Sequence, residues 1–185
     1  MKIVAISGSM NPQSTTRQAV TIVMNAAEEA GAEVELIHLG DWKLPIFDCR
    51  TDESTYPEAV HRFRDTIASA DAYIIGSPQY HGSLSGSLKN ALDFISAREL
   101  EGKFVALVGT AAGQMGATNA LNTLNEICRN LHAWPLPSSP SIPQSYSAFL
   151  PDGSLKDAKL QDRLESLGRQ LVQVMGNNGV RMDVR

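Results

Sequence analysis

Residues 71–94, DAYIIGSPQYHGSLSGSLKNALDF, decide the fold because they join a buried strand to a helix through an uncharged loop. The apolar run at 72–77 has the length and composition of a strand covered on both faces, as in a parallel sheet. Glycine, serine and proline follow it and mark a turn. A helical stripe comes next, formed by Leu88, Ala91, Leu92 and Ile95. This order is typical of a βα unit in an α/β protein.

The same unit repeats along the chain. Strand-like runs lie at 2–7, 33–39, 72–77, 103–110 and 133–139, and each is followed by a helical stripe. Five strands alternating with five helices predict a doubly wound parallel sheet with helices on both faces. The chain length favours the flavodoxin-like strand order 2-1-3-4-5, and the prolines of 133–139 place that strand at an edge. We expect a single domain over residues 1–185, since no linker interrupts the pattern.

Composition excludes several classes of function. The net charge is −4 and the chain has no basic run, so we expect no nucleic-acid partner. The apolar runs are too short to span a membrane, and the N-terminus MKIVAISGS is too short for a signal peptide. Cys49 and Cys128 lie far apart without metal-ligand spacing, which predicts free thiols, no metal site and a cytoplasmic location.

The loop after the first strand, SGSMNPQSTTRQ (7–18), is rich in hydroxyl groups and leads into a helix that starts near Ser14. The free N–H groups and the dipole at such a helix start favour an anion, and no acidic residue occurs before Glu28. These features predict a phosphate site. The alternative is that Ser14 only caps the helix, with ordinary turn residues around it. Neither the dinucleotide-binding motif G-x-G-x-x-G nor a P-loop is present.

Two further loops join the first at the same edge of the predicted sheet, because the carboxyl ends of neighbouring parallel strands meet there. They lie at 77–86 and 109–119, and both consist mainly of small or uncharged residues. No acidic residue occurs between Asp71 and Asp93, or between Glu101 and Glu126. The three loops predict a ligand that carries negative charge and has a flat face. The alternative for their glycines is loop flexibility and helix capping.

Residues 77–94 resemble the motif S-P-[EQ]-Y-[NH]-x-x-x-x-G-x-L-K-N-A-[LI]-D-[WF] of the NADPH-dependent FMN reductase family, which includes azobenzene, quinone and chromate reductases. GSMNPQST (8–15) resembles the family's phosphate loop, and GTAAGQMGATNALNTL (109–124) resembles its loop over the flavin ring. The resemblance extends over residues 2 to about 135. Many members carry arginine where Asn11 stands, and Arg17 is a candidate to replace that charge.

The resemblance implies an enzyme that binds FMN, takes a hydride from NADPH or NADH, and reduces a small-molecule acceptor. These acceptors are quinones, azo dyes, free flavin, and metal oxyanions or chelates. The residues implied for the phosphate are Ser9, Asn11, Ser14, Thr15, Thr16 and Arg17. Those implied along the isoalloxazine edge are Pro78, Gln79, Tyr80, His81 and Gly82. Those implied on the other side of the ring are Thr110, Ala111, Gly113 and Gln114.

Some roles stay open at this stage. His81 is either a proton donor or a residue that only forms hydrogen bonds. The apolar residues of the loop 40–57 either pack on the sheet or form a substrate wall. Family members are homodimers or homotetramers, and the additional apolar residues Leu84 and Phe94 beside the helix stripe predict such an interface. One rival function is a flavodoxin-type electron carrier, which the lack of acidic residues near the site disfavours. The other is a nucleotide-binding regulatory module without chemistry.

Overall fold

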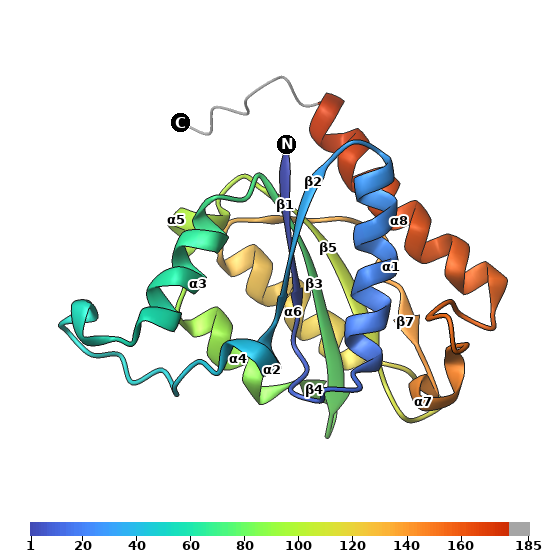
Figure 1. The fold of residues 1–185 in the computed structure, drawn as a ribbon, viewed down its shortest axis with the longest axis horizontal. Helices are drawn as coiled ribbons and strands as arrows, with labels where there is room; N and C mark the ends of the chain where they lie inside the picture. The colour runs from blue at the N-terminus through green and yellow to red at the C-terminus, as the bar shows by residue number, and fades with distance from the viewer. Residues whose placement is uncertain (178–185) are drawn as a thin grey trace.

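The computed structural model describes residues 1–177, which form a parallel sheet between two layers of helices (Figure 1). The strands follow the order β2-β1-β3-β5-β6, and each neighbouring pair is parallel. Their bounds are β1 Lys2–Ser7, β2 Glu33–His38, β3 Ala72–Tyr80, β5 Phe104–Thr110 and β6 Trp134–Pro135. Numbered as the sequence predicts them, these strands have the order 2-1-3-4-5, so the predicted topology is confirmed.

The helices divide between the two faces of the sheet. Alternate strand residues such as Ile3, Ile74 and Val108 pack under α1 (Thr15–Glu29) and α8 (Ala158–Asn177). The intervening strand residues, such as Val4, Ile75 and Leu107, point to the opposite face and pack under α3, α4 and α6. The bounds of these three helices are Glu58–Ala68, Gly86–Asp93 and Thr118–Asn130. This alternation explains why the strands are apolar throughout. Within residues 1–177, no helix is long and apolar enough to cross a membrane.

The edge of the sheet differs from the prediction. The expected strand 133–139 is replaced by β6 and by β7 (Ser141–Ile142), and both pair with β5. Pro137 and Pro140 lie between the two pieces, and a proline has no N–H with which to continue a ladder.

β3 is longer than expected. It continues to Tyr80 and turns back into β4 (Ser83–Leu84). The two turn residues, His81 and Gly82, have φ angles of +50° and +81°. Such left-handed values are those of a tight two-residue hairpin, where glycine is favoured. The predicted loop 77–86 is therefore an ordered hairpin.

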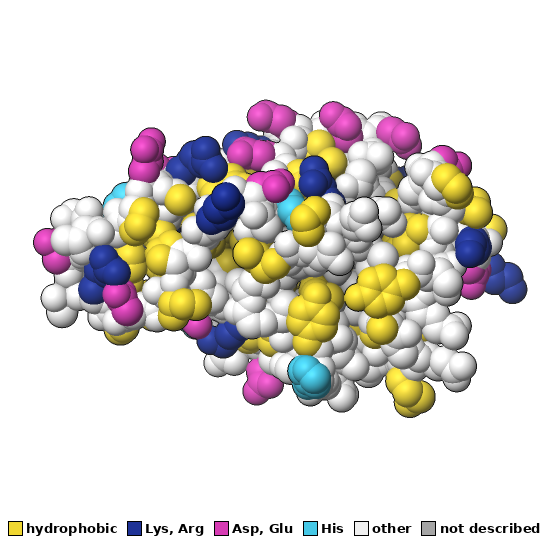
Figure 2. All heavy atoms as spheres, turned by 60° about the horizontal axis from the view of Figure 1, so that its bottom comes forward, with side chains coloured by type: hydrophobic (Ala, Val, Ile, Leu, Met, Phe, Trp, Pro, Cys, Tyr) yellow, Lys and Arg dark blue, Asp and Glu magenta, His cyan; other side chains and the backbone are white. Residues whose placement is uncertain are grey.

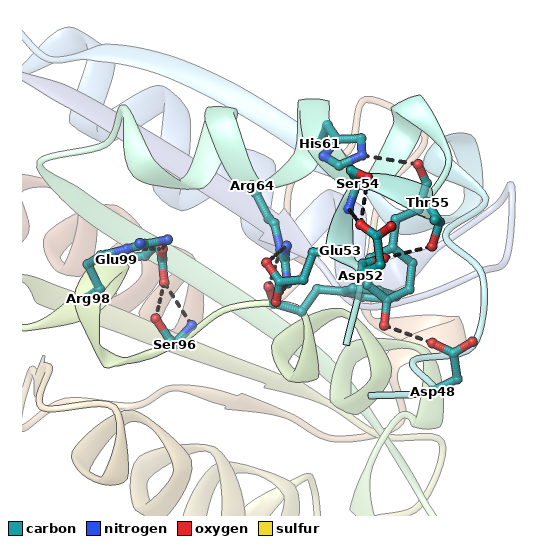
Figure 3. Close-up of polar contacts among 12 residues, drawn as sticks. Asp48, Asp52, Glu53, Ser54, Thr55, His61, Arg64, Ser96, Arg98 and Glu99 are labelled. Atoms are coloured by element: carbon teal, nitrogen blue, oxygen red, sulfur yellow. Dashed lines mark hydrogen bonds and ion pairs between the residues drawn. The ribbon is translucent and has the colours of Figure 1, made fainter. Parts of the chain in front are cut away.

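The segment 43–57 packs against the helices α3 and α4, and Figure 3 shows the polar contacts that fix it. Tyr56 donates a hydrogen bond to Asp48, and Arg64 of α3 pairs with Glu53. Glu53 opens a short 3-10 helix, η1 (Glu53–Thr55). Asn90 of α4 donates to the carbonyl of Pro45 and accepts from the Phe47 N–H. The segment is thus bonded along much of its length.

This packing corrects one prediction. Phe94 is only 2% exposed because Phe47 and Tyr56 cover its ring, each at 5.2 Å between centroids in edge-to-face geometry. Leu84 is buried as well. The expectation that these two side chains leave an uncovered apolar face was therefore wrong. Ile46 lies in the same segment, points outward and is 79% exposed.

Candidate functional site

The site lies where the strands end, at the lower edge of Figure 1, and it starts with a sharp turn after β1. The Gly8 N–H donates to the Gly76 carbonyl at 2.8 Å, and Ser87 Oγ donates to the Gly8 carbonyl at 2.9 Å. A Cβ on Gly8 would lie 2.8 Å from Leu88 Cβ and 2.9 Å from the Gly76 oxygen. Only glycine lets the turn pack this closely on β3 and α4.

The turn leads into α1, where Ser14 is the N-cap, so the capping role named as the alternative for this residue is present. Its Oγ accepts a hydrogen bond from the Arg17 N–H at 3.0 Å, which leaves its own hydroxyl proton for another partner. Within residues 1–177, no hydrogen bond engages the N–H groups of Thr15 and Thr16. These are the unsatisfied donors that a helix start presents to an anion.

The hydroxyl groups of α1 reach two other loops. Thr16 Oγ1 and Thr110 Oγ1 lie 2.7 Å apart in a buried hydrogen bond, which ties α1 to the end of β5. Thr15 Oγ1 donates to Ser145 Oγ at 3.1 Å, and Ser145 opens the short helix α7 (Ser145–Ala148). The start of α1 is therefore held by contacts with residues about a hundred or more positions away.

These segments surround a cavity of about 170 Å³. Ten of the predicted residues line it: Ser9, Asn11, Ser14, Thr15, Thr16, Pro78, Gln79, Tyr80, Thr110 and Ala111. Three further residues line it that the sequence did not single out: Ala112, Ser145 and Tyr146. All of these side chains are uncharged at neutral pH. The structure thus brings the three predicted loops together around one hollow.

Five predicted residues lie outside the lining. The Arg17 guanidinium is 3.9 Å from Asp41, an acid of α2 (Leu39–Trp42), and Arg17 lines a different groove, between α1 and α8. His81 and Gly82 form the exposed tip of the β3–β4 hairpin, and Gly113 and Gln114 lie exposed on the loop after β5. These four residues border the site without facing into the hollow.

The side chain of Gln79 has a structural role that the sequence did not indicate. Its side-chain Nε2 donates to the Gly116 carbonyl at 3.2 Å, and its Oε1 accepts from the Ala120 N–H at 3.1 Å. Both carboxamide atoms therefore connect β3 to the loop and helix that follow β5. What Gln79 offers a ligand is mainly its backbone.

The segment around α7 is the fourth wall of the site. Ala111 donates its N–H to the Ile142 carbonyl, and the Ser145 N–H donates to the Ala111 carbonyl at 2.9 Å. The Gln144 N–H donates to the Gly113 carbonyl at 3.2 Å. These bonds hold Tyr146 at the cavity, where its side chain is 74% exposed. In the sequence this segment is only a proline- and serine-rich loop, so composition gave no signal for it.

The surface around the site has few charges. Figure 2 brings this edge of the sheet forward and shows yellow and white side chains over the middle of the face, with most acidic side chains along the upper rim. An anion at the start of α1 would lie near N–H and hydroxyl donors, and no residue that lines the cavity carries a carboxylate. The arrangement therefore suits a phosphate group with a planar apolar portion beside it.

The comparison with known proteins agrees with this site. A family model described as NADPH-dependent FMN reductase matches residues 1–147. The chain belongs to this family. An NADPH azoreductase of Bacillus sp. is 31% identical over 137 residues, which are 74% of this chain and 74% of the relative. An NAD(P)H-dependent FMN reductase of Pseudomonas aeruginosa is 30% identical, over 89% of this chain and 90% of its own length.

Solved structures support the same class. FerB of Paracoccus denitrificans, a flavoenzyme NAD(P)H:acceptor oxidoreductase, superposes with a TM-score of 0.79 at 26% identity, over 95% of this chain and 97% of its own. An archaeal flavodoxin superposes with a TM-score of 0.67 at 16% identity, over 95% of this chain and 99% of its own. The second likeness concerns the fold alone. Family membership therefore favours a flavin-dependent oxidoreductase over a flavodoxin-type carrier.

Proposed function

We propose that this protein uses FMN to pass electrons from NADPH or NADH to a small-molecule acceptor, such as a quinone, an azo dye, free flavin, or a metal oxyanion or chelate. The observation that carries the proposal is the uncharged cavity in which the free donors of α1 meet two loops of small residues. The names of the relatives, which include an azoreductase and a probable quinone oxidoreductase, point to the same acceptors.

The residues present fit the phosphate of FMN. The hydroxyl of Ser14 and the N–H groups of Thr15 and Thr16 are free to donate. Asn11 uses its Oδ1 to accept from the Gln13 N–H, so its amide group remains available. We assign the phosphate to these groups and to Ser9. Arg17 would contribute only long-range charge, since its guanidinium lies beside Asp41.

The remaining lining fits the ring system. Pro78, Tyr80 and the backbone of Gln79 would border it on one side, with Thr110 and Ala111 on the other. His81, Gly82, Gly113 and Gln114 would lie along its outer edge. The cavity of about 170 Å³ is smaller than a typical ligand pocket of roughly 300–1,000 Å³, so it would enclose only part of the cofactor. A ring left partly uncovered remains accessible to the nicotinamide and to the acceptor.

When bound, FMN would supply the redox chemistry, which is hydride uptake from the nicotinamide and delivery of the electrons to the acceptor. The chain binds and orients its partners with neutral groups, and the buried Thr16–Thr110 bond keeps two walls at a fixed separation. His81 is exposed on the hairpin, and we propose that it hydrogen-bonds or donates a proton to a ligand outside the cavity.

The proposal includes a homodimer or homotetramer in the cytoplasm. A second hollow of about 260 Å³ lies beside the site, and its lining includes Leu39, Leu44, Met10 and Ile46. Met10 is 51% exposed and Ile46 is 79% exposed, which is unfavourable for apolar side chains in water and favours cover by another chain. The free thiols of Cys49 and Cys128 support a reducing compartment.

The test is a steady-state screen of the FMN-loaded protein with NADH and NADPH against quinones, azo dyes, ferric chelates and free FMN. We expect rapid turnover with at least one acceptor class, and no turnover by the protein without FMN. A protein that binds FMN but oxidises neither nucleotide with any acceptor would contradict the proposal.

A further inference from the structure

His38 is a buried titratable residue directly beneath the proposed phosphate turn. It is the last residue of β2 and pairs in register with Ser7, the last residue of β1. Its side chain is 3% exposed, and its Nδ1 lies 3.2 Å from Ser7 Oγ. Ser7 is followed at once by Gly8 and Ser9, so the imidazole supports the point where β1 becomes the turn.

The other ring nitrogen is without a partner. Among buried side-chain nitrogen and oxygen atoms of residues 1–177, His38 Nε2 is the one that forms no hydrogen bond. A Cβ on Gly40 would lie 3.0 Å from this atom and 3.1 Å from the carbonyl oxygen of Met10. The ring and the turn therefore share one small space beside Gly40. Met10 stands between Ser9 and Asn11, which both line the cavity.

The charge around His38 is nearly balanced. Arg17 of α1 and Asp41 of α2 are the charged groups that act on it, and they lie 3.9 Å from each other. Burial lowers the pKa of His38, the guanidinium of Arg17 lowers it further, and Asp41 and the backbone of Asn11 oppose the shift. Without a ligand the imidazole is therefore neutral at pH 7, the form in which a buried nitrogen without a partner costs least.

We propose that His38 is a positioning residue of the phosphate turn, and that it takes up a proton from solvent when an anionic phosphate binds at the start of α1. The inference rests on the proposed function, because it needs a phosphate ligand at that place. The cavity lining carries no cation, so a bound phosphate lacks a charged partner there. An anion nearby favours the imidazolium form. In that form both ring nitrogens are donors, and the added positive charge attracts the bound phosphate across the turn.

The direct test is an NMR titration of the His38 imidazole in the protein without ligand, with FMN, and with riboflavin, which has the ring system but no phosphate. We expect FMN to raise the pKa of His38 by about one unit or more, and riboflavin to leave it nearly unchanged. An equal pKa in the ligand-free and FMN-bound protein overturns the inference while FMN binding itself stands. Failure of FMN to bind at all overturns the proposed function, and the inference falls with it.

A matched pair of variants gives a second readout. His38→Asn keeps a group that can bond to Ser7 but cannot be protonated, and His132→Asn changes an exposed histidine away from the site. On going from pH 8 to pH 6, the ratio of FMN affinity to riboflavin affinity should rise more in the parent and in His132→Asn than in His38→Asn. For a one-unit rise of the His38 pKa, the difference between them is about threefold. The second ionisation of the FMN phosphate, near pH 6, acts equally on all three proteins.

Parallel pH profiles in the parent and His38→Asn overturn the inference. If His38→Asn fails to fold, which its thermal melting without ligand would reveal, the NMR titration of the parent still decides.

Discussion

Replacing Ser14 by aspartate separates the anion site from the helix cap. Aspartate caps a helix about as well as serine, and a carboxylate is favourable at a helix start. The variant should therefore fold with a free energy of unfolding within about 0.5 kcal/mol of the parent. Its carboxylate, however, would stand beside the free N–H groups of Thr15 and Thr16, where the phosphate of FMN is proposed to bind.

The expected loss of affinity follows from the repulsion of the two charges. A phosphomonoester carries about −1.5 to −2 charges at pH 7. At a separation of about 5 Å from a carboxylate, the repulsion is about 1.5 kcal/mol in a water-like medium and about 6 kcal/mol at an effective dielectric constant of 20. FMN affinity should accordingly fall at least tenfold, and by about ten-thousandfold if the site is shielded from water.

The assay is quenching of flavin fluorescence, with Ser14→Asn as the control that caps the helix without adding charge. Ser14→Asp should weaken FMN binding at least tenfold more than Ser14→Asn does, and should change riboflavin binding little. Equal affinity for FMN in the parent and in Ser14→Asp, at equal stability, would refute the placement of the phosphate.

Three further variants test other parts of the structure. Gly113→Val should lower flavin affinity or turnover, because the valine side chain keeps the flavin ring away from the backbone. The melting temperature should not change, because a Cβ at this position meets no heavy atom within 4 Å. Normal flavin kinetics would argue against this prediction. Burial raises the pKa of Glu99, but hydrogen bonds from Ser96 and Arg98 outweigh it and lower the pKa to about 2. The ionised carboxylate therefore stabilises the folded state above its ordinary pKa, and this stabilisation is lost as the pH falls toward 2. Glu99→Gln should lower the free energy of unfolding by about 1–3 kcal/mol at pH 7, as measured with urea. The difference in this free energy between parent and variant should become smaller below pH 4.5. A difference that does not change with pH would contradict the prediction. Ile46→Glu should shift sedimentation toward the monomer, and an unchanged mass would exclude Ile46 from a subunit interface.

The parts of the fold that the sequence predicts are those set by local patterns. Apolar runs of strand length, alternating with helical stripes, are sufficient to predict the parallel sheet, and the chain length favours its strand order. The sequence offers Ser14 both as an anion contact and, alternatively, as a helix cap, and the structure shows the cap. The glycine- and serine-rich loops mark the correct edge of the sheet, because parallel strands end there together.

The parts that the sequence does not predict depend on contacts between distant segments. Phe94 is covered by residues of the segment 43–57, which has no periodic pattern. Thr15 and Ser145 are 130 positions apart, and their bond brings α7 to the cavity. Gln79 looks like a ligand contact in its motif, yet its side chain joins two elements of the scaffold. Each of these features follows from packing in three dimensions, which local composition does not encode.

The most direct test of the central claim is anaerobic mixing of NADPH or NADH with the protein loaded with FMN, followed by absorbance. We expect FMN to bind in a stoichiometric amount, the nucleotide to bleach the flavin absorbance, and a quinone or an azo dye to restore it. A protein that binds no FMN would contradict the proposed function. So would a bound flavin whose absorbance neither nucleotide changes.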